Sequence, residues 1–112
     1  MTDEQILKKA IEKATNNGFK WINFANSIGS RGLTQNLARD LIEQQQVALL
    51  IFNHKFAEAI WGENYPVVRL TAEIESKSGG EDGFTRNLST WQFHLLQMVL
   101  EEEPLKYIEK FL

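Results

Sequence analysis

Cysteine is absent from this sequence of 112 residues, and proline occurs only twice. The lack of cysteine excludes disulfide frameworks and thiolate metal sites, which support many small secreted domains. The longest apolar run covers residues 47–52, far short of the roughly 20 residues that a membrane-spanning helix needs. The first residues are charged rather than apolar, unlike a signal peptide. We therefore expect a cytoplasmic protein that makes no contact with a membrane.

Positive charge is also scarce, since the formal net charge is -3 and the pI is near 5.4. The four arginines are scattered, and the lysines that come closest to a cluster are interrupted by acids: Lys8, Lys9, Lys13 and Lys20, with Glu4 and Glu12 among them. A negative chain has no general attraction to a polyanion. Nucleic-acid binding through the lysines of the predicted first helix, Lys8, Lys9 and Lys13, and through Arg31 is therefore only a third alternative for the function.

The composition is that of one globular domain covering residues 1–112, because 43% of the residues are hydrophobic and 11% are aromatic. Thr2 and Gln5 have the spacing of a capping box, and a helical apolar stripe follows. These signals predict a helix from Asp3 to Asn16. Gly18 then provides the left-handed conformation that ends many helices.

Residues 34–61 carry a longer helical stripe, which includes Leu37, Leu41, Phe52, Phe56 and Ile60. An unbroken helix of that length would measure about 42 Å, whereas a chain of this size has a radius of gyration near 13 Å. The sequence therefore predicts a break near Gln44–Gln46, with helices over about 35–44 and 46–61. Gly62 ends the second of these helices.

The apolar run at 47–52 could be a buried strand instead of part of that helix, and two further short segments also fit either structure. Residues 19–24 are rich in aromatics, and residues 67–74 alternate between apolar and polar side chains while also fitting helical spacing. Glycine and serine at 27–34 and 76–83 indicate loops. The prediction is a mainly α domain of four or five helices, with an α+β alternative in which 19–24 and 67–74 form a short two-stranded β element.

The C-terminal residues carry the clearest helix signals. Ser89 and Gln92 have the spacing of a capping box, and Trp91, Leu95 and Met98 begin an apolar stripe. Pro104 suits the first position of a new helix. Because that last helix is short, its apolar residues are expected to dock on the domain or on a second copy: Leu105, Tyr107, Ile108, Phe111 and Leu112.

His54, Glu58 and His94 are the candidate chemical residues. His54 and Glu58 lie four residues apart on a predicted helix, and His94 lies on the apolar face of another. Two imidazoles and a carboxylate could bind a metal ion if these helices packed together. The favoured interpretation is that both histidines are hydrogen-bonded structural residues. We expect no catalytic residue and no cofactor, since the chain lacks a cysteine nucleophile, a Gly-x-Ser-x-Gly elbow and a P-loop.

Two segments, FNHKFAEAIWGE at 52–63 and WQFHLLQMVLEEEPLKYIEKFL at 91–112, resemble small proteins of bacteriophages and prophages. That group has no established activity, so the resemblance implies a bacterial cytoplasm without implying catalytic residues. We expect a non-enzymatic accessory protein that acts through protein contacts, as a homo-oligomer or with a host or phage partner. The alternative is a metal-dependent enzyme that uses His54, Glu58 and His94.

Overall fold

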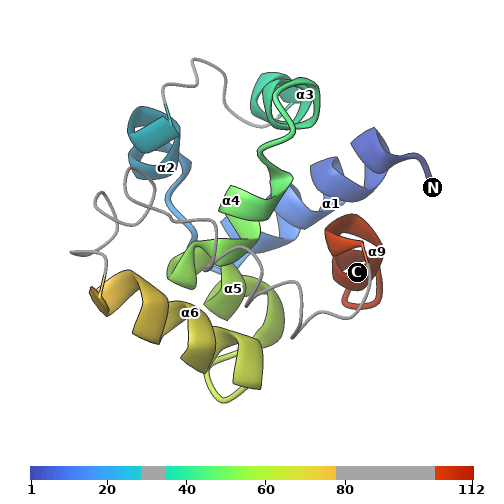
Figure 1. Ribbon diagram of the computed structural model, residues 1–112. Coiled ribbons are helices and arrows are strands. Elements are labelled where there is room, and N and C mark those ends of the chain that lie inside the picture. Colours follow the sequence, from blue (N-terminus) through green and yellow to red (C-terminus); the bar gives the residue numbers. More distant parts are fainter. Residues whose placement is uncertain (29–34, 78–102) are drawn as a thin grey trace.

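The computed structural model describes residues 1–28, 35–77 and 103–112. Within these ranges the chain forms seven helices and no strand: α1 (Asp3–Asn16), α2 (Trp21–Ile28), α3 (Gln35–Glu43), α4 (Val47–Phe52), α5 (His54–Trp61), α6 (Pro66–Lys77) and α9 (Pro104–Glu109). Figure 1 shows α5 at the centre, where it packs against α1, α4 and α6. The predicted mainly helical fold is confirmed, but four or five helices was too few.

α1 begins and ends where the sequence predicts. The Thr2 hydroxyl accepts a hydrogen bond from Gln5 N at 3.2 Å, and Gln5 Oε1 accepts one from Thr2 N at 3.0 Å. At the other end, Gly18 has φ +96°. Phe19 N donates to Ala14 O at 2.9 Å, and Gly18 N donates to Thr15 O at 3.1 Å. This pair of bonds is a Schellman motif, which turns the chain sharply after the helix.

The predicted break near Gln44–Gln46 is confirmed, since α3 ends at Glu43 and α4 begins at Val47. The turn repeats the motif at the end of α1: Gln46 N donates to Leu41 O at 2.8 Å, and Gln45 N donates to Ile42 O at 3.2 Å. Gln45 takes the left-handed position with φ +55°. A side chain therefore occupies a position that glycine usually holds.

The prediction of a single helix over 46–61 is wrong, because Asn53 separates α4 from α5. Its backbone is extended, with φ -66° and ψ 119°, and its Oδ1 accepts a hydrogen bond from Phe56 N at 3.1 Å. Asn53 is fully buried. The side chain thus caps a new helix in the interior of the protein. Gly62, with φ +86°, ends α5 as predicted.

The β alternatives are also wrong, since residues 47–52 form α4, and α2 and α6 cover most of the two segments proposed as a strand pair. The buried residues follow helical spacing: Trp21, Phe24 and Ala25 in α2, and Val67, Val68, Thr71 and Ile74 in α6. Spacings of three and four residues place these side chains on one side of a helix, whereas a strand would divide them between two faces. Residues 27 and 28, predicted as loop, belong to α2, and residues 76 and 77, also predicted as loop, belong to α6.

α9 begins with Pro104 at its first position, as predicted, and packs against α1 and α4. Ile108 is fully buried, and Tyr107 and Phe111 join Trp61 and Tyr65 in a ring cluster with centroids 5.5 to 6.3 Å apart. Tyr65 and Tyr107 share a hydrogen bond of 2.6 Å between their hydroxyls. Leu112 is 42% exposed, so the alternative in which it docks on its own domain is wrong, and docking on a second copy stays a prediction. The predicted capping box at Ser89–Gln92 lies outside the described residues.

The described helices are short, the longest being α1 with 14 residues. None of the helices within 1–28, 35–77 and 103–112 combines the length and the apolar character that crossing a bilayer requires. The cytoplasmic location stays a prediction.

Candidate functional site

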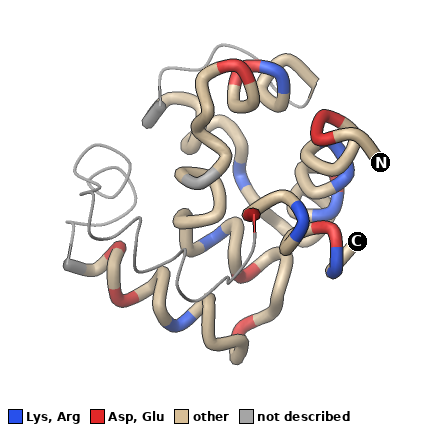
Figure 2. The backbone as a smooth tube through the Cα atoms, turned by 45° about the vertical axis from the view of Figure 1, so that its right-hand side comes forward, with Lys and Arg blue, Asp and Glu red and all other residues tan. Residues whose placement is uncertain are grey.

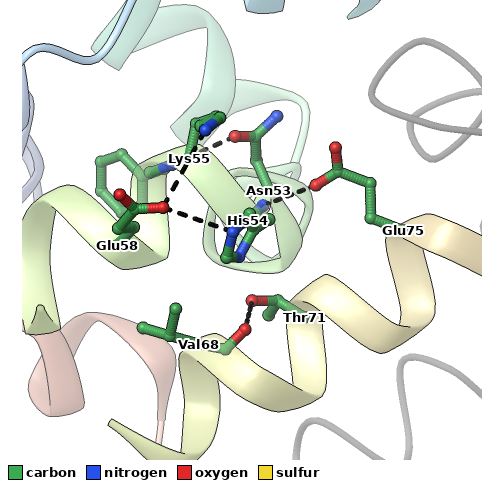
Figure 3. A network of polar contacts seen from close by, with 8 residues as sticks. Asn53, His54, Lys55, Glu58, Val68, Thr71 and Glu75 are labelled. Atoms are coloured by element: carbon green, nitrogen blue, oxygen red, sulfur yellow. Dashed lines mark hydrogen bonds and ion pairs between the residues drawn. The ribbon is translucent and has the colours of Figure 1, made fainter. Parts of the chain in front are cut away.

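His54 and Glu58, two of the three residues predicted for a metal site, meet on α5. Their spacing places both side chains on one side of the helix, and His54 Nε2 lies 3.3 Å from Glu58 Oε2. Lys55 Nζ lies 4.0 Å from the same oxygen. Figure 3 shows the imidazole and the ammonium group converging on Glu58 near the beginning of α5. The third predicted residue, His94, lies outside the described residues.

A second carboxylate, which sequence reasoning missed, comes from α6. Glu75 Oε2 accepts a hydrogen bond from the backbone N–H of His54 at 3.2 Å (Figure 3). The first N–H groups of a helix have no partner inside it, and negative charge is favourable beside them. Glu75 and Asn53 therefore both secure the beginning of α5. The Glu75 contact joins residues 21 apart in the sequence, so no local pattern announces it.

Glu58 also determines which tautomer His54 adopts. The Nδ1 atom of His54 is buried and has no hydrogen-bond partner in the described part of the chain. A proton on Nδ1 would lack an acceptor, which is costly for a buried donor. The neutral ring therefore carries its proton on Nε2 and donates it to Glu58. This arrangement matches the favoured interpretation of His54 as a hydrogen-bonded structural residue.

The same two atoms could also bind a metal ion. Two ligands about 2.0–2.1 Å from a tetrahedral zinc ion lie about 3.3 Å apart, and His54 Nε2 and Glu58 Oε2 have this separation. Among the described residues, however, no three His, Cys, Asp or Glu side chains are grouped closely enough to hold a metal ion. His54 and Glu58 could supply two ligands, and the others would come from water or from outside the described residues.

Glu58 and Lys55 also line a groove of about 740 Å³ between α5 and the corner that joins α1 to α2. We call it the α5 groove. Its remaining lining comes from residues 17–20, from residues 59–62 and from Asn23. Phe19 and Trp61 are almost fully buried there, whereas Asn17, Lys20 and Lys55 are exposed. The α5 groove therefore has buried aromatic rings in its walls and polar groups that water can reach.

Local sequence signals explain how the α5 groove is built. The Schellman motif at Gly18 reverses the chain and brings Phe19 and Lys20 beside α5. Asn17 Nδ2 donates to Ala59 O at 2.7 Å, which supplies a donor to one of the last carbonyls of α5. The indole N–H of Trp21 donates to the Thr15 hydroxyl. These side-chain bonds hold the α1–α2 corner against α5.

Sequence reasoning missed Asn17 and Lys20 as groove residues. The Asn17–Gly18 pair indicated only the end of a helix, and Lys20 seemed one of several solvated lysines. The two sides of the groove lie about 40 residues apart, since Asn17 bonds to Ala59 across 42 positions. Comparison of the chain with protein-family models, with curated proteins and with solved structures found no match. The geometry of the described residues therefore carries the functional argument.

Proposed function

We propose that this chain is a non-enzymatic accessory protein that acts by binding proteins, including a second copy of itself. The observation that carries the proposal is the α5 groove, in which buried rings adjoin exposed lysine, amide and carboxylate groups. Protein interfaces combine an apolar centre with a polar rim in the same way. In keeping with the sequence resemblance, we place the protein in a bacterial cytoplasm, as a protein of phage or prophage origin whose partner is a phage or host protein.

Ile22 supports self-association. Its side chain is 62% exposed, the largest exposed fraction among the large hydrophobic residues described. Ile22 precedes Asn23 in the sequence, and Asn23 lines the α5 groove. A symmetric dimer would place Ile22 of each copy against the same face of the other, so one apolar side chain would be buried twice. We therefore propose the outer face of α2 as the contact between two copies.

Sedimentation velocity over a range of protein concentrations tests self-association. The expected result is a mass that rises above that of the 12.9 kDa protomer, and Ile22→Glu should keep the protein monomeric. Leu112→Glu is the matched control, since it makes the same change at another exposed leucine-sized side chain. A wild-type protein that stays monomeric throughout would refute self-association. If Leu112→Glu made the protein monomeric and Ile22→Glu did not, the contact between two copies would lie at Leu112 and not on α2.

A metal-dependent enzyme that uses His54, Glu58 and His94 is the second candidate function. The 3.3 Å separation of His54 Nε2 and Glu58 Oε2 favours it, because two ligands of one zinc ion would have this spacing. In that case the metal would activate a bound water molecule. His54 and Glu58 are partly exposed, at 23% and 38% of their side chains, so an ion could reach them.

Metal analysis separates the two candidate functions. If the chain is a metal enzyme, the purified protein should contain stoichiometric zinc or a similar ion, and both His54→Ala and His94→Ala should remove it. Lys55→Ala, which changes a neighbouring side chain that cannot act as an imidazole ligand, should keep the metal. Equal metal content in the wild type and both histidine variants would rule out this candidate.

A further inference from the structure

We infer that a second groove, at the beginning of α9, binds a segment of a partner protein that carries a lysine or arginine beside aliphatic residues. The inference rests on the proposed function, because it adds a surface for protein binding and names the chemistry of the partner. It depends on three features of this groove: an apolar lining that reaches the surface, two carboxylates without partners, and a lining that contains no cation among the described residues.

The groove lies where three parts of the fold meet: the beginning of α1, the turn between α3 and α4, and the beginning of α9. We call it the α9 groove, and its volume is about 560 Å³. Its apolar lining consists of four side chains that are only half-buried: Ile42, Val47, Pro104 and Leu105. Aliphatic groups from outside the chain can therefore pack on this lining, which the buried rings of the α5 groove do not allow.

The two carboxylates belong to Asp3 and Glu103, which lie at the beginnings of α1 and α9. Asp3 and Leu105 line the α9 groove at one end of this helix pair. At the other end, the Lys13 ammonium group donates a hydrogen bond to Phe111 O. The two helices therefore run in the same direction, so their beginnings meet and bring the two acids to one groove.

Neither carboxylate has a partner of its own. Among the described residues, no hydrogen bond or ion pair involves the side chain of Asp3 or Glu103, and both residues are exposed. Negative charge is favourable beside a helix N-terminus, which explains why an acid begins each helix. A helix N-terminus carries only about half of an elementary charge, so the two helix ends offset about one of the two carboxylates. A net negative charge therefore remains in the α9 groove.

The third feature is the lack of a lysine or arginine in the described lining, whose remaining member is Gln45 with an exposed side chain. Figure 2 shows acidic segments at the beginnings of α1 and α9, with the basic segments of both helices farther along. The phosphate backbone of a nucleic acid is repelled by such a groove.

A lysine or arginine side chain matches both parts of the lining. Its aliphatic stem packs along apolar surface while its charged end stays in water, here beside the carboxylates of Asp3 and Glu103. Aliphatic residues next to it in the partner's sequence extend the apolar contact over Val47 and Leu105. A basic side chain flanked by aliphatic residues is therefore the partner chemistry that fits the α9 groove.

Titration of the isotope-labelled protein with synthetic peptides, followed by NMR, tests the inference. Three peptides of equal length share the same aliphatic residues and carry lysine, glutamine or glutamate at the remaining positions. A fourth peptide keeps the lysines and has serine in place of the aliphatic residues. The first peptide should bind most tightly and shift the amide signals of residues 42–47 and 103–105. Raising the salt concentration should weaken its binding, because exposed ion pairs are screened.

Removal of one groove charge supplies the matched comparison. Glu103→Gln should weaken binding of the first peptide by about threefold, as expected for the loss of one exposed ion pair. Glu109→Gln makes the same change at an exposed acid of α9 that does not line the groove, and it should change binding much less. Equal weakening by the two variants would show that only net charge acts, which would overturn the inference.

The remaining outcomes separate this inference from the proposed function. Equal binding of the lysine and glutamine peptides, or equal binding of the two lysine peptides, would overturn the stated partner chemistry. Shifts confined to residues 17–20 and 55–62 would assign the binding to the α5 groove, which would overturn the inference and support the proposed function. If no peptide bound, the inference would fail. The proposed function would then stand if the mass in sedimentation velocity still rose with concentration, and would fail if the protein were strictly monomeric.

Discussion

The two Schellman motifs of this protein differ in the residue at their left-handed position, and exchanging these residues should change stability in opposite directions. Gly18 follows α1 with φ +96°, and Gln45 follows α3 with φ +55°. Both turns contain the same pair of backbone hydrogen bonds. Gln45→Gly is therefore expected to stabilise the protein, and Gly18→Gln to destabilise it.

The magnitudes follow from the two φ values. For a residue with a side chain, the left-handed conformation costs about 1–2 kcal/mol in conformational free energy. Glycine avoids that cost but loses about 0.5–1 kcal/mol more in chain entropy when the protein folds. Gln45→Gly should therefore gain about 0.5 kcal/mol, or roughly 2 °C in Tm. The φ of Gly18 lies beyond the small left-handed region near +50 to +70°. Gly18→Gln should therefore lower the stability by about 1–2 kcal/mol, a larger change than that of Gln45→Gly.

Urea unfolding followed by circular dichroism measures both changes, and the slope against urea should stay constant if only stability changes. A Cβ atom at Gly18 would meet no atom within 4 Å, so Gly18→Ala controls for the longer glutamine side chain and should lose nearly as much. A loss of stability in Gln45→Gly would refute the reasoning, because it would show that the Gln45 side chain contributes more than its backbone conformation costs.

Three further predictions concern the ends of α5 and the attachment of α9. In urea unfolding, Asn53→Ala should lower the free energy of unfolding by about 2 kcal/mol, and Thr2→Ala, which removes an exposed cap, by about 1 kcal/mol. The buried change costs more because water cannot replace the acceptor of the Phe56 N–H. Equal losses would contradict this. In thermal unfolding, Tyr65→Phe and Tyr107→Phe should each lower the stability by about 1 kcal/mol. The double variant should lose no more than either single variant, because every one of the three lacks the same hydrogen bond between the two hydroxyls. Gly62→Ala should lower the free energy of unfolding by about 1–3 kcal/mol, because φ +86° and ψ 160° lie in a region that is almost exclusive to glycine. The loss is not steric, since the added Cβ would have open space. An unchanged urea midpoint would contradict that account.

Signals that act within one or two helical turns predicted the structure well. The capping box at Thr2 and Gln5, the glycines after α1 and α5, and Pro104 at the beginning of α9 each fix a few hydrogen bonds or one backbone angle. Such effects depend on adjacent residues, so the sequence displays them directly. The break after α3 was found differently, since an unbroken helix would have been too long for the domain.

The errors came from segments whose local pattern fits two structures. Residues 67–74 have apolar side chains at spacings of both two and three, and only burial of Thr71 and Ile74 with Val67 and Val68 decides for a helix. Asn53 was hidden within an apolar stripe that continues across it. An asparagine three residues before a phenylalanine can cap a helix or lie within one, and the packing of α4 against α5 determines which occurs.

The candidate site shows the same division between local and distant contacts. The spacing of His54 and Glu58 predicted their contact, because four residues make one helical turn. The α5 groove could not be predicted in this way, since its two sides are held together by Asn17 and Ala59, 42 residues apart. Yet its position depends on a local event: the turn at Gly18 directs Asn17 toward α5 and places Lys20 on the groove. A backbone conformation that serves to end one helix thereby also determines which charges a bound partner would meet.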